Sequence, residues 1–301
     1  MAGYTATTRP NYLSAWLEAA RPATLPAAVV PVIVGTAAAS GHGALRPWSF
    51  VAAFVCALLI QIGTNFANDL FDFQKGADTA DRIGPRRISQ SGLVAIGQVA
   101  AATYITFGLA AVFGLYLVAV SGWPILLAGV LSILSGVAYT GGPWPLGYHG
   151  LGDVFVFVFF GVVAVVGSAF VQTNTISLLA VVAAIPVGFL VTAILVVNNL
   201  RDVDTDRRAG KRTLAVRIGR TATRRQYAAL LMASYLIPLA LWWAGWLGGT
   251  FWLPWLSLPL AASLIQTVGR DSDGPSLNRA LKRTGQLHLL FGVLFAASFI
   301  W

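Results

Sequence analysis

The chain has 301 residues, of which 57% are hydrophobic and 10% are charged, and its mean hydropathy is +0.73. Soluble domains carry charge on about a quarter of their residues, so this composition excludes an ordinary soluble domain and predicts an all-α membrane protein in a lipid bilayer. The net charge of +9 requires no nucleic acid partner, because membrane topology and contact with anionic lipids account for basic residues gathered at one face.

Nine apolar stretches approach or reach the length that a helix needs to cross a bilayer, which is about 17–25 residues. In chain order they cover residues 23–40, 49–68, 98–120, 123–140, 153–172, 176–198, 227–246, 251–268 and 287–301. The last stretch is the most marginal of them. The pattern predicts nine transmembrane helices in a single integral membrane domain over residues 1–301.

The distribution of charge predicts the orientation of these helices. If the amino terminus is cytoplasmic, nine crossings place every Lys and Arg except Arg46 on the cytoplasmic side, as the positive-inside rule requires. All eleven carboxylates fall on the same side. Topology does not demand acidic residues, so we expect a site for an ionic ligand at the cytoplasmic face of the cell inner membrane.

The second apolar stretch ends in acidic and amide side chains. Asn65, Asn68, Asp69 and Asp72 follow i, i+3, i+4, i+7 spacing, so they lie along one stripe of a helix. Asp78 follows a few residues later. An Asp at the centre of a transmembrane helix costs about 2.5–3.5 kcal/mol, so the cluster indicates a functional site rather than packing.

A second polar cluster ends the sixth stretch. Asn198, Asp202 and Asp206 are spaced four residues apart and share one helical stripe. The two clusters end helices that are four helices apart, which predicts two four-helix halves, plus a ninth helix, around a central cavity. Facing acidic stripes suit Mg²⁺, which shares its coordination with substrate phosphates. The sequence therefore predicts Mg²⁺ and a diphosphate.

Basic side chains flank both clusters. A diphosphate with metal needs such donors, and arginine offers a two-pronged fork to phosphate. Ion pairing with the neighbouring aspartates is the alternative role for the same side chains. The candidates for substrate binding are Arg82, Arg87, Arg201 and Lys211, together with the amide of Asn65.

The predicted cytoplasmic loop over residues 138–153 differs from the others because it carries no Lys or Arg. Proline and glycine make it irregular, and Tyr139 and Asp153 stand at its two ends. With Tyr148, these residues are candidates for an aromatic acceptor pocket. An aromatic belt at the membrane interface is the alternative interpretation.

These motifs resemble the UbiA superfamily of intramembrane aromatic prenyltransferases, and more closely its branch that acts on 1,4-dihydroxy-2-naphthoate. The resemblance runs in order through residues 20–26, 61–69, 84–87, 90–93, 139–143, 198–202 and 210–215. One position departs from the family pattern, since Asp153 stands where Glu is expected.

The resemblance implies nine helices around a central cavity, dependence on Mg²⁺, and a polyprenyl diphosphate as donor. The chain would be transferred to 1,4-dihydroxy-2-naphthoate with loss of the carboxylate, giving demethylmenaquinone. The metal–diphosphate residues would be Asn68, Asp72, Asp78, Asn198, Asp202 and Asp206, to which we add Asp69. Catalytic roles would fall to Asp72, Asp202, Tyr139 and Asp153, with Tyr148 beside the acceptor.

Two alternatives remain open from the sequence. A sister prenyltransferase would use 4-hydroxybenzoate or homogentisate as its aromatic acceptor. A membrane transporter is the alternative from another class, but its charges should lie near the bilayer centre, whereas these lie at one face. The sequence does not indicate the donor chain length or the oligomeric state.

Overall fold

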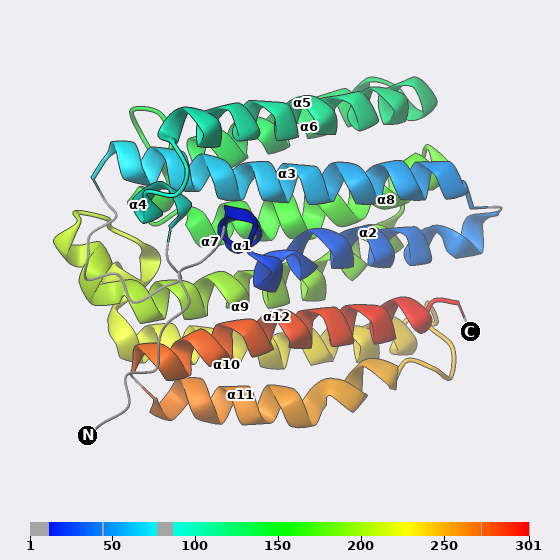
Figure 1. Cartoon of the computed structure of the whole chain (residues 1–301). Helices are drawn as coiled ribbons and strands as arrows, with labels where there is room; N and C mark the ends of the chain where they lie inside the picture. The colour runs from blue at the N-terminus through cyan, green and yellow to red at the C-terminus, as the bar shows by residue number, and fades with distance from the viewer. Residues whose placement is uncertain (1–11, 44, 77–86, 272, 301) are drawn as a thin grey trace.

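The computed structural model describes residues 12–43, 45–76, 87–271 and 273–300, and within these it contains helices and no strand (Figure 1). The α-helices are α1 (Tyr12–Ala20), α2 (Pro26–Ala39), α3 (Pro47–Gln74), α4 (Ile88–Ser91), α5 (Ile96–Ser121), α6 (Trp123–Ala138), α7 (Gly152–Val156), α8 (Ala164–Thr173), α9 (Leu178–Arg208), α10 (Leu214–Trp243), α11 (Leu258–Arg270) and α12 (Gly274–Ala297). Shorter turns are η1 (Pro22–Thr24), η2 (Ser40–His42), η3 (Leu146–His149), η5 (Leu253–Ser257) and a π-helix, η4 (Phe157–Val163). The predicted all-α class is confirmed.

The number of membrane spans is confirmed only in part. Among the described residues, five helices are long and apolar enough to cross a bilayer. They are α3, α5, the continuous helix Gly152–Thr173, α9 and α10. A sixth span is formed if the helix pair Tyr12–Thr24 and Pro26–Ala39, which is bent by 47°, counts as one span. The other predicted stretches are also largely helical, but α6 has 16 residues, α11 has 13, and the first half of α12 is charged. Nine spans in two four-helix halves therefore stay a prediction.

Helix boundaries follow from prolines and capping side chains. Pro47 occupies the first turn of α3, where its missing N–H removes no helical hydrogen bond. At the start of α9, the Ser177 hydroxyl oxygen accepts a hydrogen bond from the Ala180 N–H at 3.1 Å. Asp273 caps α12 in the same way, accepting from the Ser276 N–H at 2.8 Å. Such caps satisfy N–H groups that the first turn leaves unpaired.

The long helices lie side by side with roughly parallel axes (Figure 1). The ends of α3 and α9 and the beginnings of α10 and α12 meet at one end of the molecule, on the left of that view, which we call the polar end. Helix α9 is the most central, because 72% of its most apolar segment is buried, against 28% to 33% for the other four long helices. The second polar cluster is thus carried by the best-packed helix.

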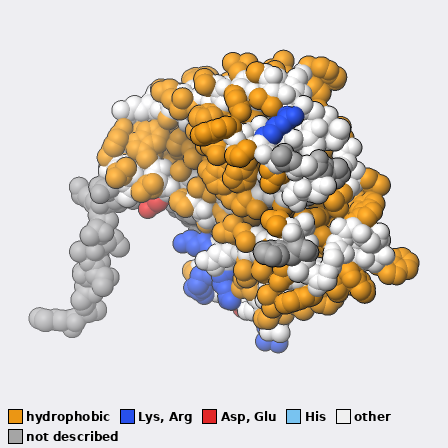
Figure 2. Space-filling model, turned by 90° about the vertical axis from the view of Figure 1, so that its right-hand side faces the viewer, with side chains coloured by type: hydrophobic (Ala, Val, Ile, Leu, Met, Phe, Trp, Pro, Cys, Tyr) orange, Lys and Arg blue, Asp and Glu red, His pale blue; other side chains and the backbone are white. Residues whose placement is uncertain are grey.

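The opposite end of the molecule is mostly apolar. Figure 2 views this end and shows hydrophobic side chains over most of it, with few charged ones. Tyr104 and Leu115 on α5 are 74% and 61% exposed, as expected of side chains that face lipid. The protein is an integral membrane protein with its charged helix ends gathered at the polar end.

The π-helix η4 packs closely against α9. A Cβ added to Gly161 would lie 2.6 Å from the Cα of Gly188, which is closer than two carbon atoms pack. The two backbones therefore meet through glycines. Short π-segments inside α-helices often occur at functional sites, and Phe159 and Phe160 of this segment line a pocket.

Candidate functional site

A polar cavity lies inside the polar end of the bundle. It has about 1120 Å³ of empty space, part of it open to solvent. Helix α3 contributes Gln61, Thr64, Asn65, Asn68 and Asp72, and α9 contributes Asn198, Asn199, Asp202 and Asp206. The two stripes predicted from spacing therefore line one cavity.

Asp72 lines this cavity and is 2% exposed. Its Oδ2 accepts a hydrogen bond from Arg87 Nη2 at 2.7 Å. Its Oδ1 accepts from the Tyr148 hydroxyl at 2.7 Å and from Lys211 Nζ at 3.1 Å. Three predicted substrate-binding residues thus meet on one predicted metal ligand.

Asp202 is held by the arginine next to it in the chain. Arg201 Nε donates to Asp202 Oδ1 at 2.8 Å, and Arg201 Nη2 donates to Asp202 Oδ2 at 2.6 Å. The same Nη2 also donates to Asn198 Oδ1 at 2.9 Å, while Nη1 donates to Asn278 Oδ1 on α12 at 2.6 Å. Asn198 and Asp202 of the second cluster therefore share one buried guanidinium.

The loop between α6 and α7 closes over the first cluster. Thr140 Oγ1 donates to Asn68 Oδ1 at 2.8 Å, and Lys75 Nζ donates to the carbonyls of Thr140 at 2.6 Å and Gly142 at 3.1 Å. The pKa of Lys75 is lowered overall. Loss of hydration is the main cause, Asp72 acts in the opposite direction, and the positive charge of Lys211 lowers the pKa further.

Two lysines approach the Tyr148 ring. Lys211 Nζ is 4.6 Å and Lys75 Nζ is 5.2 Å from its centroid, within the range of cation–π attraction. Tyr148 therefore makes cation–π contacts with two lysines and a hydrogen bond to Asp72. This arrangement gathers positive charge where the sequence predicts a diphosphate.

Asp69 has a different surrounding from its neighbours in the first cluster. It is buried but does not line the cavity. Its Oδ2 accepts from the N–H groups of Ile88 at 2.9 Å and Ser89 at 3.4 Å, and its Oδ1 lies 3.2 Å from Arg87 Nε. In this arrangement Asp69 holds the start of α4 and positions Arg87, and its role as a metal ligand stays a prediction.

The predicted acceptor residues divide between the cavity and the layer behind it. Tyr139 and Tyr148 line the cavity, whereas Asp153 does not. Asp153 is 7% exposed, and its Oδ2 accepts from Gln226 Nε2 at 2.6 Å. A Cβ added to Gly152 would lie 2.9 Å from the Tyr139 hydroxyl oxygen, so Tyr139 packs against the start of α7. Asp153 therefore lies behind Tyr139.

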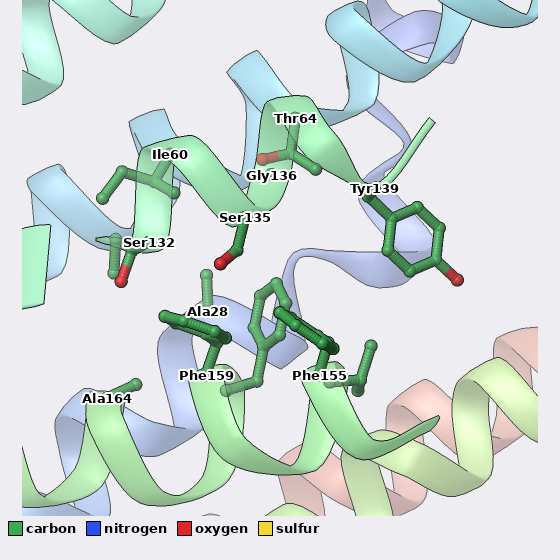
Figure 3. Close-up of a pocket in the computed structure, with 13 residues that line it drawn as sticks. Ala28, Ile60, Thr64, Ser132, Ser135, Gly136, Tyr139, Phe155, Phe159 and Ala164 are labelled. Carbon is green, nitrogen blue, oxygen red and sulfur yellow. The ribbon is translucent and has the colours of Figure 1, made fainter. Parts of the chain in front are cut away.

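A second, apolar pocket adjoins the polar cavity (Figure 3). It has about 660 Å³ of empty space, part of it open. Phe155 and Phe159 rise into it from below, Ser132 and Ser135 face them from α6, and Tyr139 stands at one side. The two spaces share the lining residues Thr64, Tyr139, Val156 and Phe160. A ligand with a charged head and an apolar chain could therefore occupy both.

The predicted site residues and the residues that line the cavity do not coincide fully. Asp78 and Arg82, which were predicted, lie outside the described residues. Gln61, Thr140 and Asn199 line the cavity but were not predicted as site residues. Gln61 stands four residues before Asn65, so the same spacing argument, continued by one turn, would have found it.

The cavity lining fits Mg²⁺ only if a ligand completes its coordination. Within the described part of the chain, no three acidic, histidine or cysteine side chains converge on one point. Asn68, Asp72, Asn198, Asp202 and Asp206 nevertheless supply the carboxylate and amide oxygens that Mg²⁺ takes alongside substrate phosphates. The donor set is suited to an ion shared with a phosphate-bearing ligand.

Comparison with known proteins adds independent information. A family model described as "UbiA prenyltransferase family" matches residues 28–291. The chain is 42% identical to 1,4-dihydroxy-2-naphthoate octaprenyltransferase of Escherichia coli (strain K12), over 93% of each protein. It is 36% identical to the protein of the same name from Mycobacterium leprae (strain TN), over 94% of this chain and 95% of the relative.

The fold also matches a solved structure. A UbiA homolog from Archaeoglobus fulgidus bound to DMAPP and Mg²⁺ superposes with a TM-score of 0.63, covering 94% of this chain and 99% of that one. Sequence identity is 13%, and the comparison shows that the two proteins share a fold.

Proposed function

Because the chain belongs to the UbiA prenyltransferase family, we propose that it transfers a polyprenyl chain from an isoprenyl diphosphate to 1,4-dihydroxy-2-naphthoate. The acceptor would lose its carboxylate, and the product would be demethylmenaquinone. The names of the relatives at 42% and 36% identity support this acceptor. The structural observation that carries the proposal is the polar cavity with two acidic stripes, joined to an aromatic, apolar pocket.

The diphosphate would bind between α3 and α9. Arg87 and Lys211 now contact Asp72, and Arg201 contacts Asp202. When the donor binds, these cations would turn to phosphate oxygens, and the carboxylates would be released toward the metal. Arg82 and Asp78 would join this set. Oxygens of Asn68, Asp72, Asn198, Asp202 and Asp206 would hold Mg²⁺, and Asp69 would join them only if its carboxylate left the N–H groups of Ile88 and Ser89.

Bound Mg²⁺ would supply positive charge that stabilises the departing diphosphate. The Archaeoglobus homolog bound to DMAPP and Mg²⁺ supports this choice of metal. The allylic group would then carry positive charge, and the electron-rich acceptor ring would attack it. Phe155, Phe159 and Phe160 line the apolar pocket, where they would receive the chain and keep water away.

The acceptor would lie beside Tyr139 and Tyr148, with Asn65 also in the lining of the cavity. Aromatic contacts add roughly 0.5–1.5 kcal/mol beyond burial, which gives modest selectivity for two fused rings. Asp153 would act from behind Tyr139, since it accepts from Gln226 rather than lining the cavity. We place the protein in the cell inner membrane with its amino terminus and polar end on the cytoplasmic side.

A competition experiment tests the proposed acceptor. Purified protein with Mg²⁺ and a polyprenyl diphosphate is offered equal amounts of 1,4-dihydroxy-2-naphthoate, 4-hydroxybenzoate and homogentisate, and products are identified by mass spectrometry. The main product should be the prenylated, decarboxylated naphthoquinol. Prenylated 4-hydroxybenzoate or homogentisate as the main product would replace this proposal with a sister activity, and no prenylated product would favour the transporter alternative.

A further inference from the structure

Gln61 extends the polar stripe of α3 toward the middle of the bundle. It precedes Asn65 by one turn, and with Asn68 and Asp72 it completes i, i+4, i+7, i+11 spacing. Its side chain lines the polar cavity and is only 6% exposed. At 1.5 Å per residue, it lies about 16 Å along the helix from Asp72. It is therefore well away from the metal-binding end of the cavity.

Local hydrogen bonds fix the orientation of the Gln61 amide. The Thr24 hydroxyl donates its single hydrogen to the Arg21 carbonyl at 3.0 Å. It can therefore only accept from Gln61, whose Nε2 lies 3.3 Å away. This assignment directs Nε2 toward Thr24 and leaves Oε1 on the other side of the amide.

Gln61 Oε1 is buried and has no hydrogen-bond partner within the described structure. A buried acceptor that stays unpaired is costly, so such a group in a cavity wall indicates a missing donor. That donor would come from a ligand that enters the cavity. The residue is thus better suited to binding than to packing.

The chemistry of the two substrates identifies the donor. A prenyl diphosphate offers phosphate oxygens and a hydrocarbon chain, and neither donates a hydrogen bond to a carbonyl oxygen. A dihydroxy aromatic acid carries O–H groups that do. Gln61 lines the polar cavity but not the apolar pocket, whereas its neighbours Ile60 and Thr64 line the pocket that fits the chain.

We propose that Gln61 Oε1 accepts a hydrogen bond from a ring hydroxyl of the aromatic acceptor and thereby marks the acceptor subsite. This inference rests on the function proposed above and adds the residue that recognises the hydroxyl. The cationic Arg21 lines the same wall, which suits an acceptor that carries a carboxylate. Gln61 would hold the ring on the side of the cavity where its amide contacts Thr24.

The substitution Gln61→Met tests the inference, because it keeps the length of the side chain and removes the acceptor oxygen. The KM for 1,4-dihydroxy-2-naphthoate should rise about tenfold, while the KM for the prenyl diphosphate and the Mg²⁺ requirement stay unchanged. The matched control is Gln172→Met, since Gln172 is also buried, at 4% exposed, but lies outside the cavity. It should leave both KM values unchanged.

A measurement on the unmodified protein covers the case in which Gln61→Met does not fold. Inhibition constants are determined for 1-hydroxy-2-naphthoate and 4-hydroxy-2-naphthoate, each of which lacks one hydroxyl. The analogue that lacks the recognised hydroxyl should bind about tenfold more weakly than the other, and Gln61→Met should abolish this difference.

Two results would overturn the inference: an unchanged acceptor KM in folded Gln61→Met, or equal binding of the two analogues to the unmodified protein. Failure of the unmodified protein to prenylate the dihydroxy acid would instead refute the proposed function. The wild-type assay therefore separates the two failures.

Discussion

Asp72 and Asp202 each combine deep burial with a cationic partner, and in the proposed reaction both must exchange that partner for metal. Arg87 contacts Asp72 at 2.7 Å, and Arg201 contacts Asp202 at 2.6 Å. Breaking a buried ion pair by removing one partner costs about 3–5 kcal/mol. Loss of either carboxylate therefore affects both stability and metal binding, and the two effects must be measured separately.

We expect Asp72→Ala and Asp202→Ala each to lower kcat about 100-fold or more, because each removes an oxygen ligand of the proposed metal site. Turnover is measured over a range of Mg²⁺ concentrations, and folding is checked by thermal unfolding. The matched control is Asp204→Ala on the same helix, because the Asp204 side chain is 62% exposed and pairs with Arg220 at 2.8 Å. Exposed pairs contribute about 0–1 kcal/mol, so this variant should keep its activity.

Full activity of either variant, or turnover in an excess of chelator, would contradict the metal assignment. Loss of activity in Asp204→Ala to the same degree would show that the effect is not specific to the cavity.

At this scale the sequence predicted which residues share a cavity, but not every orientation. Spacings of three and four residues correctly placed Asn65, Asn68 and Asp72 along one face of α3. Asp69 follows Asn68 by one residue, a rotation of about 100° on a helix, and it contacts α4 instead. Spacing alone does not show which edge of a stripe faces a neighbour, because that depends on where α4 packs.

Among the helices, the contact between η4 and α9 controls the shape of the apolar pocket. Gly161 brings the two backbones together, and the phenylalanines of η4 face the pocket from that crossing. A methyl group at Gly161 would be forced against the Gly188 backbone. Overpacking of this kind typically costs about 1–3 kcal/mol.

Gly161→Ala should therefore lower the melting temperature and reduce turnover with long prenyl donors. The matched control is Gly167→Ala in α8, where an added Cβ would meet nothing within 4 Å. Alanine is about 0.5–1 kcal/mol better than glycine inside a helix, so this control should be neutral or slightly stabilising. Thermal unfolding in detergent measures both, and equal behaviour of the two variants would contradict the close contact.

Apolar windows predicted the helices better than their ends. Most of the stretch 227–246 belongs to α10, but that helix ends at Trp243, and it begins at Leu214 because Thr213 caps a charged, amphipathic first half. The helices α1 and α4 were not predicted, since both are too short to give an apolar window. Windows of hydropathy detect contact with lipid, whereas polar helix ends are set by caps and by packing at the polar end.

For the whole molecule, the charge pattern predicts a cytoplasmic amino terminus and an outward carboxyl terminus. The test uses single cysteines in a Cys56→Ser background, labelled from outside the cell with a reagent that cannot cross the membrane. Gly248 lies at the apolar end and Lys282 at the charged start of α12, and both are exposed. Gly248→Cys should be labelled and Lys282→Cys should not.

The reverse labelling pattern would invert the orientation, and labelling of both positions would contradict a membrane-spanning arrangement of the intervening helices.

The junction of the polar cavity with the apolar pocket has a consequence for how the catalytic cycle ends. Both substrates arrive as anions, but in the proposed reaction the quinol product keeps neither the carboxylate nor the diphosphate. The cations around Asp72 and Asp202 would then have nothing on the product to attract. The freed diphosphate would leave from the polar end into water, while the uncharged product would partition from the Phe155–Phe160 side into lipid. One reaction would thus release its charged product, diphosphate, into water and its apolar product, the quinol, into lipid.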